Sequence, residues 1–121
     1  METPEAPPRI RTVDKSIPGR TDVPTVARVL ELLTEIIDPE LGIDLVNLGL
    51  VYGVEVDGHD VKIDLTLTSA SCPVGPQILE GMKRTLGRNV PGIRAIDINV
   101  VYDPPWTAER MSATARSMMG W

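Results

Sequence analysis

The first hydrophobic pattern in the chain has the three- and four-residue spacing of an amphipathic helix. This spacing predicts a helix with one buried face after Asp22, which can serve as its N-cap. We expect the helix to end by Asp38, because the residue before Pro39 is biased away from the helical region. The apolar positions of the buried face are Val26, Val29, Leu30, Leu33, Ile36 and Ile37.

From Leu48 the pattern changes to an alternation of two, which predicts two β-strands joined at Asp57-Gly58 as a hairpin. A two-residue turn there pairs Leu50 with Leu65. A four-residue turn moves the register by two residues and keeps the same faces together. The apolar positions are Leu48, Leu50, Tyr52, Val54 and Val56 in the first strand and Val61, Ile63, Leu65 and Leu67 in the second.

The second half of the chain repeats both periodicities. Ile78, Leu79, Met82 and Leu86 predict a helix that ends near Gly87 and Asn89. Ile96, Ile98, Val100 and Tyr102 predict a third strand, which a right-handed crossover would place in the same direction as the second. Thr107 is a candidate cap for a last helix with Met111, Ala115, Met118 and Met119 on one face.

These elements predict an α/β fold of the two-layer α+β kind, with a small three-stranded sheet packed by helices. The element order is α-β-β-α-β-α. A length of 121 residues suits a single domain. Residues 1–21 contain four prolines and no apolar periodicity, so we expect a flexible N-terminal tail and one domain over residues 22–121.

Composition narrows the classes of function. Seventeen acidic and twelve basic residues give a formal charge of −5, which argues against nucleic-acid binding as the main activity. No apolar run approaches the ~20 residues that span a bilayer, and no basic or apolar leader opens the chain. We therefore expect a cytoplasmic protein without a membrane partner. The single cysteine excludes an intrachain disulfide.

That cysteine, Cys72, follows the second predicted strand in a turn of small residues. Thr68, Ser69 and Ser71 precede it and Pro73 follows it. If Pro73 opens the next helix, Cys72 is its N-cap, and the helix dipole and unpaired N–H groups favour the thiolate. If Gly75 caps a helix that Pro76 opens, Cys72 lies one turn upstream. The simpler alternative is that Cys72 is a buried apolar filler.

Two further loops carry candidate chemistry. The loop after the first helix holds Asp38 and Glu40, and the segment after the third strand holds Asp103 and Trp106. The carboxylates would add oxygen ligands to the thiolate if these loops converge on it. Trp106 is either a core plug, which we favour, or a lid over the cysteine. The only histidine, His59, lies at the hairpin tip, so we expect it at the opposite end from Cys72.

Four motifs together resemble the SufT-like metal–sulfur cluster assembly family, which includes the PaaD proteins, over about residues 22–119. The motifs are Asp38-Pro39-Glu40, Asp44-Leu45-Val46-Asn47-Leu48-Gly49-Leu50-Val51-Tyr52, Thr66-Leu67-Thr68-Ser69-Ala70-Ser71-Cys72-Pro73 and Asp103-Pro104-Pro105-Trp106. The resemblance implies a compact α/β domain that builds or delivers iron–sulfur clusters, with the cysteine as its functional residue. It also implies partners: the SUF machinery, P-loop Fe–S carrier ATPases and apo iron–sulfur client proteins. The chain has no second cysteine, which favours the cluster-assembly branch over PaaD proteins with their cysteine-rich C-terminal extension.

One cysteine also limits the chemistry. An iron–sulfur cluster usually takes four protein ligands, so we expect at most transient binding of iron or a cluster, with a homodimer as one way to share it. The leading hypothesis is a maturation factor that is not an enzyme. The alternatives are a thiol enzyme with Cys72 as nucleophile, which would need a nearby base, and a docking or PaaD-like accessory module.

Overall fold

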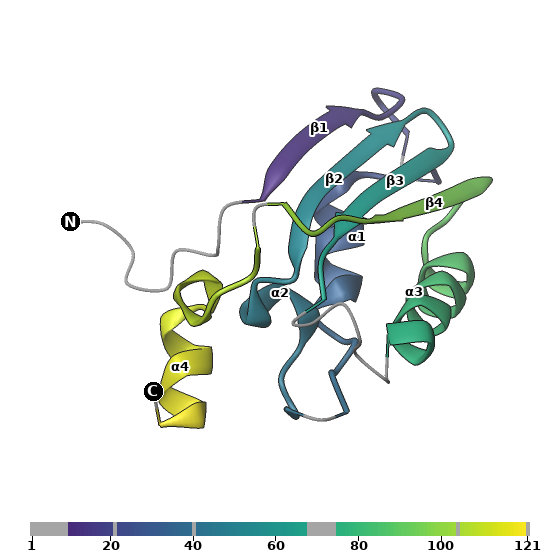
Figure 1. Ribbon diagram of the computed structural model, residues 1–121. Coiled ribbons are helices and arrows are strands. Elements are labelled where there is room, and N and C mark those ends of the chain that lie inside the picture. The colour runs from purple at the N-terminus through teal and green to yellow at the C-terminus, as the bar shows by residue number, and fades with distance from the viewer. Residues whose placement is uncertain (1–9, 21, 40, 68–74, 104, 121) are drawn as a thin grey trace.

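The structure contains a four-stranded sheet whose order is β1-β2-β3-β4. The computed structural model describes residues 10–20, 22–39, 41–67, 75–103 and 105–120. In Figure 1, α1 lies behind the sheet and the segment after β4 crosses in front of it. The strands are β1 (Arg11–Lys15), β2 (Val51–Asp57), β3 (Asp60–Leu65) and β4 (Ala95–Val100), and the helices are α1 (Val26–Leu33), α2 (Leu45–Leu48), α3 (Gly75–Asn89), the 3-10 helix η1 (Ala108–Arg110) and α4 (Ala113–Met119). None of the helices in these ranges is long and apolar enough to cross a membrane.

The predicted α/β class is confirmed, but the predicted three-stranded sheet is wrong. The fourth strand is β1, which pairs in parallel with β2 and lies within the predicted flexible tail. Four of its five side chains are exposed and only Val13 is partly buried. Because an edge strand of this kind buries little apolar surface, it leaves no hydrophobic alternation in the sequence.

Asp14 fastens the end of β1 to the start of α1. Its carboxylate accepts hydrogen bonds from the amides of Ser16 (3.0 Å) and Val26 (3.3 Å). Hydrogen bonding by Ser16, more than by Val26, lowers the pKa of Asp14 below its ordinary 3.8. A lowered pKa in the folded state means that the carboxylate stabilises the fold above the unfolded pKa, and this contribution disappears as the pH falls through the lowered value.

We therefore expect an Asp14→Ala variant to be less stable than the wild type at pH 6, and the gap to close as the pH falls below ~4. The effect is small because Asp14 is exposed. Urea unfolding of both proteins at a series of pH values measures the gap. A gap that is constant or widens toward low pH would contradict this role of the carboxylate.

The buried face of α1 is predicted in part: Leu30 is only partly buried, and Leu32, which was not predicted, is buried. The N-terminal end also differs. Thr25, not Asp22, is the N-cap, and its side chain accepts from the amide of Arg28 at 3.2 Å. Asp22 forms an ion pair with Arg20 instead. The helix ends at Leu33, and Ile37, predicted on the buried face, is 49% exposed.

The hairpin has the register of the second predicted alternative. Val54 pairs with Ile63 and Asp57 with Asp60, so the tip is Gly58-His59, where Gly58 has a φ of +62°. The register shifts between Val51 and Gly53. The first strand also begins later than predicted, because Leu48 ends α2.

The crossover from β3 to β4 is as expected in direction, since the two strands are parallel. α3 packs against α1 and β4, and its buried residues include Ile78, Met82 and Leu86. His59 lies at the hairpin tip, where its Nδ1 is 2.7 Å from the carbonyl oxygen of Gly92. Leu65, the last residue of β3, lies at the opposite end of the hairpin. Cys72 lies outside the described residues, so its separation from His59 stays a prediction.

Candidate functional site

The segment that carries Cys72 joins the end of β3 to the start of α3. Five predicted site residues, Thr68, Ser69, Ser71, Cys72 and Pro73, lie outside the described residues, and so does Glu40. The chain on the β3 side is firmly held: Thr66 is fully buried, and its amide donates to the carbonyl oxygen of Leu50 at 2.8 Å. The described residues therefore fix the two ends of this segment.

The two flanks of this segment meet in space. Gly75, the first residue of α3, is buried, and a Cβ on it would lie 3.0 Å from Cδ1 of Leu67. Leu67 and Gly75 thus lie against each other at the two ends of the segment that carries Cys72. α3 begins close to the second of the two predicted starts, because Pro76 lies in its first turn.

Asp38 makes several hydrogen bonds within its own loop. It is only 3% exposed, and its Oδ1 accepts from the amide of Leu41 at 3.2 Å. Its backbone amide donates to the carbonyl oxygen of Ile43 and its carbonyl oxygen accepts from Gly42. These contacts assign Asp38 to closing the turn between α1 and α2.

The motif from Asp44 to Gly49 forms α2 and receives the C-terminal segment. Asp44 caps the helix through the amide of Asn47 at 3.0 Å and also accepts from the Asn47 side chain at 2.7 Å. The Oδ1 of Asn47 in turn accepts from Oγ of Ser112 at 2.6 Å. Ser112, rather than the predicted Thr107, is the residue whose side chain caps α4.

Trp106 completes this docking. Its Nε1 donates to the carbonyl oxygen of Leu48 at 2.7 Å, and its partly buried ring packs against the hydrophobic core. These contacts favour the core-plug interpretation. On the predicted C-terminal helix face, Met111 and Ala115 are buried, whereas Met118 is 65% exposed.

Asp103 lies in a different environment from Asp38. It is exposed and lines a hollow of about 230 Å³ together with Arg11, Tyr52, Asp64, Val101 and Arg110. Within the described ranges, no three Asp, Glu, His or Cys side chains gather in a way that would hold a metal ion. The expected convergence of Asp38, Glu40 and Asp103 on Cys72 stays a prediction, because Glu40 and Cys72 lie outside the described residues.

The lining of this hollow includes residues that the sequence reasoning did not single out. Arg11 lies in the strand that was expected to be tail, and its Nη2 is 2.5 Å from Oδ2 of Asp64. The guanidinium carbon of Arg110 lies 3.9 Å from the centroid of the Tyr52 ring. An isolated arginine carries no periodic signal, so only the fold reveals that these side chains meet.

The fold is that of known small α/β proteins. It matches the crystal structure of a domain of unknown function, DUF59, from Bacillus anthracis with a TM-score of 0.76 and 45% identity, covering 78% of this chain and 90% of that one. It also matches a conserved hypothetical protein from Thermotoga maritima with a TM-score of 0.74 and 36% identity, covering 84% of this chain and all of that one. The class of protein is thus one with a DUF59-type α/β fold.

Sequence comparison gives the family. The family described as iron-sulfur cluster assembly protein matches residues 26–100, and this chain belongs to it. The Fe-S protein maturation auxiliary factor SufT of Staphylococcus aureus is 51% identical over 86 residues, which cover 70% of this chain and 97% of that protein. The auxiliary factor YitW of Bacillus subtilis is 40% identical over 93 residues, covering 76% of this chain and 90% of that protein. The resemblance drawn from the four motifs is confirmed.

Proposed function

We propose that this protein is an iron–sulfur protein maturation factor that holds iron or a cluster transiently at Cys72 and passes it to apo client proteins. The observation that carries the proposal is the match to SufT and YitW over nine-tenths or more of their length, because both are named Fe-S protein maturation auxiliary factors. Cys72 is the only thiol in the chain. Thiolate is the usual ligand of iron–sulfur clusters.

The short length of chain between Cys72 and the start of α3 supports its role. Three residues of chain span at most about 11 Å, so Cys72 is within this reach of Gly75 and of the N-terminus of a 15-residue helix. The positive end of a helix dipole favours the thiolate over the thiol. A thiolate is the form that binds iron.

The partners that we propose are the SUF machinery, a P-loop Fe–S carrier ATPase and apo clients. An iron-sulfur cluster carrier protein of Synechocystis is 31% identical over 81 residues, which cover 67% of this chain but only 23% of that protein. A related segment thus forms part of a longer carrier chain. Two activities that occur together in one polypeptide elsewhere are reasonable partners when they occur apart.

An accessory role fits the geometry better than catalysis. A cysteine nucleophile normally works with a nearby base, and His59, the only histidine, contacts Gly92 at the far end of the hairpin. Binding and release of a cluster need no such base. We therefore favour a factor that assists maturation over a thiol enzyme.

Anaerobic reconstitution with iron and sulfide tests this function. We expect at most about one cluster per two chains, because a cluster takes about four ligands and each chain supplies one thiolate. The cluster should be labile and should move to an apo ferredoxin added in excess. Absorbance spectra and iron and sulfide analysis, combined with native mass spectrometry, measure the content and the number of subunits.

The control is the same protein treated with iron alone, which separates cluster formation from adventitious iron. A stable monomer that keeps a full cluster in the presence of the apo ferredoxin would overturn transient binding. No cluster or iron on any species would overturn the role of Cys72 as a ligand.

A further inference from the structure

The hollow beside Tyr52 gathers charged side chains from four separate parts of the chain. Arg11 comes from β1, Asp64 from β3, Asp103 from the segment after β4, and Arg110 from η1. Its volume of about 230 Å³ lies below the roughly 300–1,000 Å³ of sites for drug-sized ligands. A ligand of this hollow must therefore be small.

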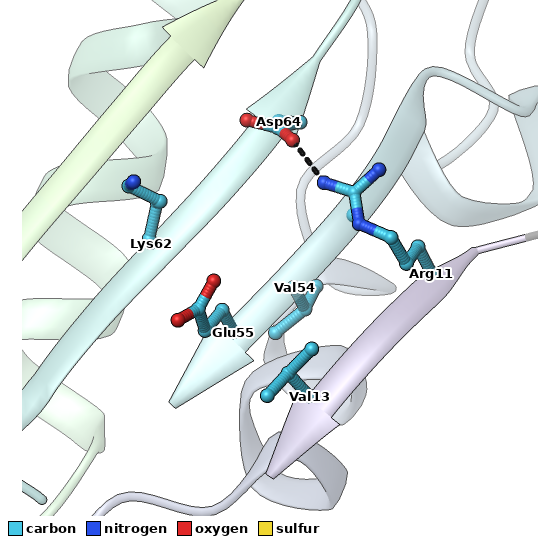
Figure 2. A pocket seen from close by; sticks show the side chains of 7 residues that line it. Arg11, Val13, Val54, Glu55, Lys62 and Asp64 are labelled. Carbon is cyan, nitrogen blue, oxygen red and sulfur yellow. Dashed lines mark hydrogen bonds and ion pairs between the residues drawn. The ribbon is translucent and has the colours of Figure 1, made fainter. Parts of the chain in front are cut away.

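Both guanidinium groups are held in place. Figure 2 shows Arg11 reaching across β2 to Asp64. Gly53 of β2 leaves room for this side chain, because a Cβ at that position would lie only 2.9 Å from Nη2 of Arg11. Asp64 is fixed from the other side by Asn99, whose Nδ2 donates to Oδ1 at 3.4 Å. Arg110 stacks on Tyr52. Groups that are already ordered lose less entropy when a ligand binds.

The charged side chains of the hollow are two hydrogen-bond donors, both arginines, and two acceptors, both aspartates. Arg11 and Arg110 each carry several N–H donors, which suit a carboxylate. Asp64 is engaged by Arg11 and Asn99, whereas exposed Asp103 makes no ion pair within the described part of the chain. We propose that the hollow binds a small zwitterion, a free α-amino acid or a close derivative, with its carboxylate on the arginines and its ammonium on Asp103.

The hollow adjoins the strand that leads to Cys72. The amide of Val101, one of its walls, donates to the carbonyl oxygen of Leu65 at 2.8 Å, and Leu65 is the last residue of β3. A cluster takes about four ligands, usually thiolates, and each chain supplies only one. If the proposed function holds, the relevant zwitterion carries a thiol, and free cysteine is the simplest member. Zwitterion binding itself does not depend on that function.

A series of four small molecules tests the proposal on the full chain. Serine and cysteine carry both charges, cysteamine lacks the carboxylate, and 3-mercaptopropionate lacks the ammonium. We expect serine and cysteine to shift the ¹⁵N-amide signals of Tyr52, Val101 and Arg110 with similar dissociation constants, and the other two to bind at least about tenfold more weakly. Equal binding of all four, or no shift with serine or cysteine, would overturn the proposal.

A pair of matched variants locates the site. Asp103→Asn should weaken serine binding about tenfold, because it removes the partner of the ammonium group. Asp97→Asn removes the same charge from an exposed residue of β4 that does not line the hollow, and it should leave binding unchanged. Equal losses in both variants would indicate a general effect of net charge and contradict the assigned site.

The outcome can be separated from that of the proposed function. A Cys72→Ser variant should bind serine as the wild type does, because the charged groups that would hold the zwitterion belong to Arg11, Asp103 and Arg110. Cluster loading without serine binding would overturn only the proposal that the hollow binds a zwitterion. Serine binding without any cluster loading would support zwitterion binding in the hollow and overturn the proposed function.

Discussion

A Cys72→Ser variant is expected to fold normally and to lose cluster loading and transfer completely. The exchange replaces sulfur by oxygen in the only thiol of the chain, so no second cysteine can take over as a ligand. The flanking contacts of Thr66 with Leu50 and of Leu67 with Gly75 are made by other residues. Because these anchors remain, we expect the free energy of unfolding to change by no more than about 0.5 kcal/mol.

The measurement compares reconstituted wild type and variant for cluster content and for activation of an apo ferredoxin, with urea unfolding as the check on folding. Ser71→Ala is the matched control, because it changes a neighbouring small residue and leaves the thiol. Reaction of native wild type with iodoacetamide should be faster than that of a free thiol at neutral pH. A variant that still transfers clusters, or a thiol that reacts only after denaturation, would contradict the assignment of Cys72.

The elements that the sequence predicts well are those that bury a long apolar stripe. α3 illustrates this: Ile78, Met82 and Leu86 face the core, and their spacing alone locates the helix. β1 shows the opposite case, since its only partly buried side chain is Val13 and its pairing with β2 depends on a partner more than 35 residues away. Hydrophobic periodicity does not reveal an edge strand that is held by backbone pairing, by the Arg11–Asp64 ion pair and by the hydrogen bond from Val26 to Asp14.

The candidate site divides in the same way. The motifs around Cys72 indicate the family and the sheet edge because they are continuous in sequence. The Arg11–Asp64 pair joins residues 53 positions apart, and nothing in either local sequence announces the other. Asp103 shows a different limit of sequence-based prediction. The sequence identifies it as a candidate site residue, but only the fold shows that its neighbours in the hollow include two arginines and Tyr52.

α2 was missed although its signals are present. Asp44 caps it and Gly49 ends it with a φ of +79°, a conformation that glycine adopts readily and other residues rarely do. The strand-like alternation begins at Leu48, which is the last residue of α2. The strand pattern therefore overlaps the end of the helix. The overlap matters because α2 is the platform on which the C-terminal segment docks.

Gly49→Ala is therefore expected to be among the most destabilising single substitutions in the described structure. A Cβ at this position would lie 2.2 Å from the carbonyl oxygen of Arg110, which is backbone and has no rotamer to change. The left-handed conformation costs a residue other than glycine about 1–2 kcal/mol, and overpacking typically adds about 1–3 kcal/mol. We expect a loss of about 2–5 kcal/mol in the free energy of unfolding.

Gly42→Ala is the matched control, because Gly42 has a similar φ of +72° but nothing lies within 4 Å of its Cβ position. It should cost only the conformational part, about 1–2 kcal/mol. Urea unfolding of both variants measures the difference. With Trp121 replaced by Phe in all proteins compared, the indole fluorescence of Trp106 reports whether the C-terminal segment separates from α2. Equal losses in the two variants would mean that the close contact between α2 and η1 does not stabilise the fold. A larger loss in Gly49→Ala, with a changed Trp106 signal, assigns the motif from Asp44 to Gly49 to holding the C-terminal segment in place.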